Sequence, residues 1–260
     1  MVVKQLKNLL SFLTVFPVAM DKDLLTDCAQ NMWAFPLIGA FLGLLAGVFG
    51  WVALQFLPSI VVGALALALL LWMTGLHHTD GLLDFGDGIM VHGSPERKVE
   101  VMHDQLTGAG AIGLTLITYI ITAFAFAELG RKMFIGNFSV PLIFPALIVV
   151  ELCAKLSMVV AAWAGKSVHQ GMNSAFLEAM HSNKGNLRLI VALAISFAIA
   201  LPLLSWAGMF TVLAGVITGL VMVAVAHKHF NGVTGDVFGA SNELSRMVCV
   251  VALLAVATWV

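Results

Sequence analysis

The stretch PSIVVGALALALLLWMTGL, residues 58–76, carries no charged residue and is followed directly by HHTDGLLDFGDG, residues 77–88. A run of about twenty apolar residues is the length that crosses the hydrocarbon core of a bilayer as a helix. The segment that follows carries three carboxylates, at Asp80, Asp84 and Asp87. An uncharged run that ends in three aspartates indicates an acidic site at the edge of a membrane.

The composition of the whole chain is that of a membrane protein. Apolar residues make up 60% of the 260 residues and charged residues only 10%, whereas about 25% of the residues of a soluble domain are charged. We therefore expect a single domain, residues 1–260, folded as an all-α polytopic membrane bundle of about seven transmembrane helices. The lipid bilayer is then an expected partner. Nucleic acid is not, because the sequence has no basic stripe.

Long uncharged runs give the expected positions of the transmembrane helices. Before the first run, Leu6, Leu9, Leu10, Leu13 and Phe16 recur at helical spacing, which predicts an amphipathic helix lying in the membrane interface. The last run has only fourteen residues, so its helix is expected to begin earlier or to lie partly in the interface. The runs are 33–57, 59–76, 109–127, 140–163, 189–206, 209–226 and 247–260.

Two features inside the runs predict how the helices pack. Glu151 and Lys155 are the main charges within them, and because they lie one helical turn apart we expect them to pair. Four glycines in the first run share a face on which another helix can approach closely. They are Gly39, Gly43, Gly47 and Gly50.

The basic residues predict the orientation of the chain. Lys4, Lys7 and Lys22 precede the first run, so the positive-inside rule places the N-terminus in the cytoplasm. All eight histidines lie in three connecting segments that seven crossings would also place in the cytoplasm. This clustering favours one polar site that faces the cytoplasm. The three segments are 77–108, 164–188 and 227–246.

The spacing of the aspartates predicts a metal site. Each residue of a helix turns about 100°, so Asp80, Asp84 and Asp87 would lie within about 40° of one another around the axis. Carboxylates crowded in this way repel each other, and a hard divalent cation relieves the repulsion. Mg²⁺ is the expected ion, with Mn²⁺ as the alternative. Zinc is not expected, because the sequence has no His/Cys set at zinc spacing.

A second polar segment, GVTGDVFGASNE in residues 232–243, places Gly235 and Gly239 on either side of Asp236. Glycines make a backbone flexible enough to bring N–H groups close to a phosphate. By itself this is a weak signal for a phosphate site. The charges of the preceding connection are expected on a solvated face, at Arg97, Lys98 and Glu100.

Taken together, the motifs resemble those of cobalamin synthase, also called adenosylcobinamide-GDP ribazoletransferase. The specific parts are TGLHHTDGLLDFGDG, residues 74–88, and TGDVFGA, residues 234–240, with Glu243. Three weaker segments extend the similarity nearly end to end: FLTVFP (12–17), PLIGAFLG (36–43) and MHDQLTG (102–108). Beside the aspartate of this last segment the chain departs from the family pattern, with His103 and Gln105 in place of a basic residue and a serine.

The resemblance implies an enzyme in the cell membrane of a prokaryote that joins adenosylcobinamide-GDP to α-ribazole, or to its 5′-phosphate. GMP would be released and adenosylcobalamin, or its 5′-phosphate, formed. Asp80, Asp84 and Asp87 would hold Mg²⁺ over the pyrophosphate, and Asp104, or His78 in its place, would be the base for the ribazole hydroxyl. The expected substrate-binding residues are Gly81, Gly88, Gly235, Asp236 and Gly239.

Two other functions stay open at this stage. One is a CDP-alcohol phosphotransferase, although its D-G-x-x-A-R signature is absent, because Asp80-Gly81 is followed by LLDF. The other is a transporter, which carboxylates spread across several spans would favour. A homo-oligomer is compatible with the sequence, which leaves the oligomeric state and the number of metal ions open.

Overall fold

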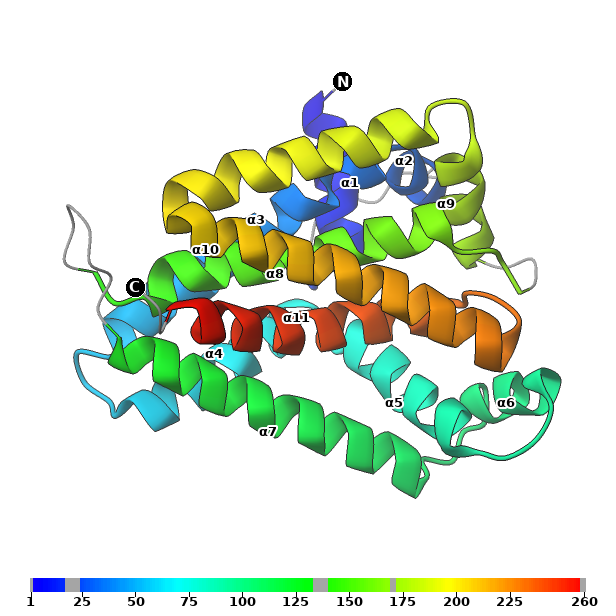
Figure 1. Ribbon diagram of the computed structural model, residues 1–260, viewed down its shortest axis with the longest axis horizontal. Coiled ribbons are helices and arrows are strands. Elements are labelled where there is room, and N and C mark those ends of the chain that lie inside the picture. The colour runs from blue at the N-terminus through cyan, green and yellow to red at the C-terminus, as the bar shows by residue number, and fades with distance from the viewer. Residues whose placement is uncertain (1, 17–23, 133–139, 169–171, 258–260) are drawn as a thin grey trace.

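The structure is a computed structural model that describes residues 2–16, 24–132, 140–168 and 172–257. Within these ranges the regular structure is helical, and only an isolated bridge between Ser167 and Val233 has β character. This confirms the all-α prediction (Figure 1). The helices are α1 (Val2–Leu13), α2 (Leu24–Gln30), the 3₁₀ helix η1 (Met32–Ala34), α3 (Phe35–Ala53), α4 (Ser59–Met73), α5 (His77–Met90), α6 (Pro95–Met102), α7 (Ala109–Arg131), α8 (Ile143–Ala164), α9 (Met172–His181), α10 (Gly185–Phe230) and α11 (Gly235–Ala257).

The glycine face of α3 packs against α8, as the sequence predicts. A Cβ atom added at Gly39 would collide with the carbonyl oxygen of Glu151, and one added at Gly43 would collide with that of Leu147. Further along, a Cβ atom at Gly47 would lie 2.7 Å from the carbonyl oxygen of Phe144. The two backbones are therefore in contact, and any side chain on this face would separate them.

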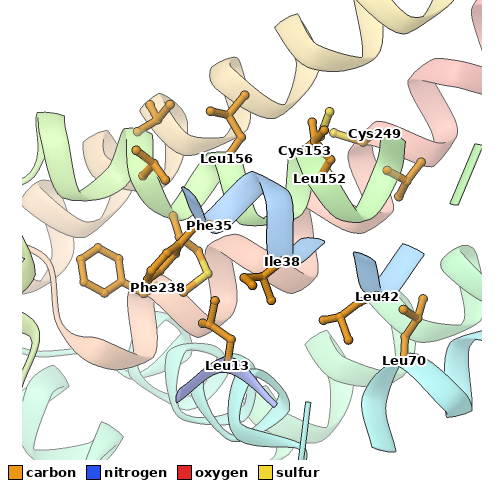
Figure 2. Close-up of a cluster of buried hydrophobic side chains, with 14 of the residues drawn as sticks. Leu13, Phe35, Ile38, Leu42, Leu70, Leu152, Cys153, Leu156, Phe238 and Cys249 are labelled. Atoms are coloured by element: carbon orange, nitrogen blue, oxygen red, sulfur yellow. The ribbon is translucent and has the colours of Figure 1, made fainter. Parts of the chain in front are cut away.

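Helix α8 is the most deeply buried helix among the described residues, and α3, α10 and α11 all pack against it. Nearly every residue from Ile143 to Ala162 is buried, which explains why this helix is apolar on all sides. Figure 2 shows part of the resulting apolar cluster, where Leu152 and Leu156 of α8 lie with Ile38 of α3.

Helix α10 contains a sharp turn rather than one straight rod. Ser205 has φ 51° and ψ −137°, which are not helical values. A Cβ atom on Gly208 would collide with the carbonyl oxygen of Ala200, although eight residues of straight helix would separate them by about 12 Å. The chain therefore folds back, and Figure 1 shows the yellow and orange halves of α10 running in opposite directions. The two halves match the predicted runs 189–206 and 209–226.

Five of the described helices are long and apolar enough to cross a membrane, or six if α4 and α5, which meet at 97°, form one broken span. The chain is therefore a multi-pass membrane protein by the length and composition of its helices. The count of seven crossings stays a prediction.

The predicted connection 227–246 is wrong. Helix α10 continues to Phe230 and α11 begins at Gly235, so only residues 231–234 connect the two helices. The described part of the weak last run, residues 247–257, is the second part of α11, so the helix begins earlier than the run, as its short length indicated. The sequence misled because Asp236, Glu243 and Arg246 make the first half of α11 look like a loop.

The charges inside the bundle join α8 to α11. Arg246, with no exposed surface, donates hydrogen bonds to both carboxylate oxygens of Glu151 and to Glu243. Lys155 donates instead to Oδ1 of Asn242 at 2.7 Å. The predicted Glu151–Lys155 pair is therefore wrong, since the partner of Glu151 is an arginine that the sequence placed in a loop. Two acids and two bases balance each other, as burial of charge requires.

Candidate active site

A bend between α4 and α5 sets the position of the acidic motif. Gly75 (φ 62°) and Leu76 (φ 60°) are both in the left-handed region, and α5 starts at His77 after a turn of 97°. Such a conformation costs little at glycine but is strained at leucine. The bend directs α5 away from the line of α4 and against α11 (Figure 1). Because α5 is polar and turned in this way, we treat it as lying outside the membrane-spanning segments.

Two of the predicted substrate-binding glycines let α5 and α11 touch. A Cβ atom on Gly81 would lie 2.9 Å from the carbonyl oxygen of Asp236 and 3.1 Å from Cα of Gly239. A Cβ atom on Gly239 would lie 3.1 Å from Cα of Gly81. This backbone contact brings together the two motifs that the sequence singled out, which lie about 150 residues apart in the chain.

The other two predicted glycines have different surroundings. A Cβ atom on Gly235 would meet nothing within 4 Å, so the space beside the first turn of α11 is open. A Cβ atom on Gly88 would collide with the side chain of Met102 on α6. Gly88 therefore serves packing between α5 and α6, whereas Gly235 leaves room for a ligand. Their roles in substrate binding stay predictions.

Carboxylates from α5 and α11 converge beside this contact. Burial, together with the negative charges of Asp236, Asp80 and Asp87, raises the pKa of Asp84 from 3.8 to about 7. Asp80 is exposed, whereas Asp84 and Asp236 are half-buried. Asp236 also accepts a hydrogen bond from Oγ1 of Thr234 at 3.2 Å. The site therefore concentrates negative charge from two helices.

Asp87 has a structural task that the sequence did not reveal. Its Oδ2 atom accepts a hydrogen bond from the backbone N–H of Gly108 at 2.6 Å, and its Oδ1 atom accepts one from that of Ala111 at 2.8 Å. Both donors belong to the start of α7, whose first N–H groups have no partner within their own helix. A carboxylate there also suits the positive end of the helix dipole. Each oxygen keeps another lone pair, so the assignment of Asp87 as a metal ligand stays a prediction.

A magnesium ion at this site would need substrate oxygens as well as protein carboxylates in its coordination shell. Among the residues that the structure describes, no group of three or more His, Cys, Asp or Glu side chains is arranged to hold a metal ion. Mg²⁺ usually binds one or two carboxylates and takes its remaining ligands from water and substrate phosphates. Asp84, with Asp236 or Asp80 as a second carboxylate beside it, would fit this pattern.

The two candidate bases lie in different places. His78 lines the cavity beside the aspartates and is 6% exposed, and its Nδ1 atom has no hydrogen-bond partner. Burial, with the charges of Lys155 and Arg246 next, holds the pKa of His78 well below 6.5, so its imidazole is neutral. Asp104 is exposed in the connection after α6, where its Oδ1 atom accepts a hydrogen bond from the N–H of Leu106 at 3.3 Å. The structure thus brings His78, but not Asp104, to the cavity lining.

A cavity of about 460 Å³ opens beside these residues. Its polar wall comes from α5 and α11 and includes His77, His78, Asp80 and Asp236. Its apolar wall comes from α1, α3, α9 and their neighbours and includes Phe12, Leu13, Met32, Phe35, Phe176 and Phe238. A cavity of this size, largely apolar with a few convergent polar groups, is typical of a small-molecule site.

Lys98 is not on a solvated face, so that prediction is wrong. It is only 9% exposed, and its Nζ atom lies 2.9 Å from Nδ1 of His229 at the end of α10. Arg97 and Glu100 are exposed as predicted and form an ion pair at 2.7 Å. The sequence offered one signal: Lys98 and the buried Met102 are four residues apart and share a face of α6.

Two further polar residues beside the site were not found from the sequence. His103, at the end of α6, is close enough to Asp236 to attract its charge. Tyr119 of α7 forms a hydrogen bond of 2.7 Å with Thr79, the residue before Asp80. The OH group of Tyr119 thus links α5 to the middle of α7. His103 lies in the weaker segment 102–108 and Tyr119 lies in no motif, and only the folded chain shows that both are beside the site.

Comparisons with known proteins match nearly the whole chain. Residues 5–254 match the family model described as cobalamin-5-phosphate synthase. The chain is similar to proteins named adenosylcobinamide-GDP ribazoletransferase. One from Methanococcoides burtonii is 28% identical, covering 97% of this chain and 92% of that protein. One from Methanocella arvoryzae is 32% identical, covering 96% of this chain and 95% of that protein. One from Thermococcus kodakarensis is 30% identical, covering 96% of this chain and 98% of that protein. No solved structure matches the chain.

Proposed function

Because the chain belongs to the cobalamin-5-phosphate synthase family, we propose that it is an adenosylcobinamide-GDP ribazoletransferase, as its relatives are named. A hydroxyl group of α-ribazole, or of its 5′-phosphate, attacks the phosphorus atom that carries the cobinamide. The bond from this phosphorus to the bridging oxygen of the pyrophosphate breaks, and GMP leaves. The hydroxyl proton passes to a base or to the departing GMP, so the products are adenosylcobalamin, or its 5′-phosphate, and GMP.

The chief obstacle to this reaction is charge. A pyrophosphate is negatively charged, and the attacking hydroxyl must approach it while further charge develops on the leaving oxygen. When bound, Mg²⁺ supplies neutralisation of that charge. Asp84 would hold the ion together with Asp80 or Asp236 and the substrate phosphates, Asp87 would remain a further candidate ligand, and His78 would orient the attacking hydroxyl as a neutral hydrogen-bonding group.

One observation carries the proposal. The acidic motif of α5 and the Thr-Gly-Asp segment of α11, distant in sequence, meet through Gly81 and Gly239. Asp80 of the first segment and Asp236 of the second then line one cavity, next to the open space at Gly235. A protein that only needed to pack its helices would have no reason to concentrate aspartates there, since their mutual repulsion is unfavourable without a cation.

The rival function as a transporter finds less support. Such a function needs carboxylates along a path through the bundle. The buried acids Glu151 and Glu243 are instead both paired with Arg246, which suits a structural tie between helices.

We also propose that the site faces the cytoplasm in the cell membrane. The Lys residues near the N-terminus and the positive-inside rule support this orientation, and a nucleotide-linked substrate would enter from the compartment in which nucleotides are made.

The test is direct. Purified protein in liposomes is incubated with adenosylcobinamide-GDP, α-ribazole and either Mg²⁺ or a chelator, and GMP is measured. Wild-type protein should release GMP only with the metal. Asp84→Asn should lower the rate at least about a hundredfold, because loss of a ligand would misplace a metal ion that stabilises the transition state by several kcal/mol. Glu100→Gln, at the exposed ion pair, should keep the wild-type rate. Wild-type protein that binds both substrates and never releases GMP would overturn the proposal.

A further inference from the structure

The apolar wall of the cavity is built around one phenylalanine. The ring of Phe176 on α9 lies 5.3 Å from that of Phe12 on α1, 6.0 Å from that of Phe35 on α3 and 6.5 Å from that of Phe238 on α11. All four rings line the cavity. They come from four different helices, so the cluster exists only in the folded chain.

The geometry of the rings suits a planar guest. Phe176 meets Phe12 at 33°, Phe35 at 66° and Phe238 at 80°. The rings thus present both faces and edges to the cavity. Aromatic groups prefer offset or edge-to-face contacts, with ring centroids about 4.5–7 Å apart. An aromatic heterocycle could contact several of them at once.

The aromatic wall is continuous with the acidic site. Phe238 stands between Asp236 and Gly239 in sequence, and all three line the same cavity. Figure 2 shows Phe238 beside Phe35, with Leu13 of α1 nearby. A ligand with a flat apolar part and a hydroxyl-bearing sugar would place the first among the rings and the second near the carboxylates.

We propose that this cavity is the binding site for the acceptor nucleoside, and that the Phe176 cluster holds its aromatic base. The inference rests on the proposed function, which supplies a nucleoside acceptor with a benzimidazole base. The volume of about 460 Å³ is near the lower end of the range of about 300–1,000 Å³ for ligand pockets. It suits a nucleoside, whereas the far larger corrinoid donor must lie mainly outside and extend only its pyrophosphate to the aspartates.

Helix α1 completes the site. Ser11, Phe12 and Leu13 at its end line the cavity, so the amphipathic segment predicted to lie in the interface also covers the acceptor. Phe12 is only partly buried, unlike the other three rings. It forms the accessible edge of the cluster.

The test uses Phe176→Leu, which keeps an apolar side chain but removes the ring. The matched control is Phe126→Leu on α7, where the phenylalanine is equally buried but lies outside the cavity. Phe176→Leu should raise the KM for α-ribazole at least about tenfold, as the loss of aromatic contacts predicts, and leave kcat and the KM for adenosylcobinamide-GDP within about twofold. Phe126→Leu should leave both KM values unchanged. If Phe176→Leu does not fold, Phe12→Leu at the accessible edge serves in its place.

Binding without turnover separates this inference from the proposed function. Equilibrium dialysis of radiolabelled α-ribazole on the wild type should show binding that benzimidazole displaces and GMP does not. If the wild type forms no product but binds α-ribazole in this way, and Phe176→Leu loses this binding while Phe126→Leu keeps it, the proposed function fails and the nucleoside site stands. If it forms product and Phe176→Leu has the same KM for α-ribazole as Phe126→Leu, the acceptor site is overturned. The acceptor site would also be overturned if lipid co-purifies with the wild type and not with Phe176→Leu, while the KM for α-ribazole is unchanged. The cavity would then be a lipid site.

Discussion

Asp87 of α5 accepts a hydrogen bond from the backbone N–H of Gly108 at the start of α7, and the N–O distance is 2.6 Å. The third aspartate of the motif is thus bonded to the backbone of another helix, whereas Asp84 faces other carboxylates. Two residues of the same type, three positions apart, therefore play different physical roles.

Asp87→Ala should destabilise the protein, because the N–H groups of Gly108 and Ala111 would lose their acceptors. A lost helix cap costs about 0.5–2 kcal/mol. The loss should appear as a lower midpoint of thermal unfolding in detergent. Asp84→Asn should not lower this midpoint in the absence of metal, because it removes repulsion instead of a bond. An Asp87→Ala protein as stable as the wild type would contradict the capping role.

Divalent cations should stabilise the wild type against heat. A ligand at 100 times its Kd adds about 2.7 kcal/mol to the free energy of unfolding. Scanning fluorimetry with and without Mg²⁺ measures the shift, which Asp84→Asn should largely abolish. Asp104→Asn, in the exposed connection, should respond like the wild type. If Asp84→Asn is stabilised by Mg²⁺ as strongly as the wild type, the aspartates are not the principal ligands.

The stability of the metal-free protein should fall as the pH rises. The pKa of Asp84 is about 7 in the fold and 3.8 as its ordinary value, so the folded state binds this proton more tightly than the unfolded state. Its contribution to stability is present below about pH 4 and is lost as the pH rises to about 7. Unfolding midpoints with a chelator from pH 5 to pH 8 should decline more for the wild type than for Asp84→Asn. Equal slopes would rule out this carboxyl as the cause.

Arg246→Met should severely reduce the amount of folded protein. It would leave Glu151 and Glu243 buried without their partner, and breaking a buried ion pair on one side costs about 3–5 kcal/mol. Arg97→Met is the control, because its ion pair with Glu100 is exposed and such pairs contribute at most about 1 kcal/mol. Size-exclusion profiles after detergent extraction compare the two. Similar yields of monodisperse protein would show that the network does not hold α8 to α11.

Single cysteines should report the orientation. In a background without Cys28, Cys153 and Cys249, cysteines at the exposed positions Ser94, Ser182 and Lys228 would sample two connections and the end of α10, all near histidines. All three should resist a membrane-impermeant thiol reagent in intact cells and react after lysis. Labelling of one position from outside would show that the connections do not share the cytoplasmic side.

The sequence predicted the membrane helices well where a single physical signal dominated. Long apolar runs located α3, α7 and α8, and the glycines of α3 correctly marked its contact with another helix. The first half of α11 was missed because its charges read as a loop, although Arg246 is paired with Glu151 on α8 and with Glu243 on its own helix. Local hydropathy contains no information about such partners.

The candidate site was predicted in outline rather than in detail. The sequence identified the motifs around Asp84 and Asp236 but could not show that Gly81 and Gly239 bring them into contact. It treated Asp80, Asp84 and Asp87 as equivalent, since helical spacing does not reveal which backbone N–H groups lie nearby. The cluster around Phe176 was unpredictable for the same reason, because its members share no periodicity.

The bend at Gly75 and Leu76 also fixes how deep the chemistry lies. Helix α4 has 15 residues and rises about 22 Å, less than the hydrocarbon thickness of about 30 Å that a full span must cross. Because α5 lies outside the membrane-spanning segments, the bilayer must thin locally around α4 to meet the bend. The free energy of this thinning rises with bilayer thickness, so a thicker membrane would strain the bend that presents the aspartates.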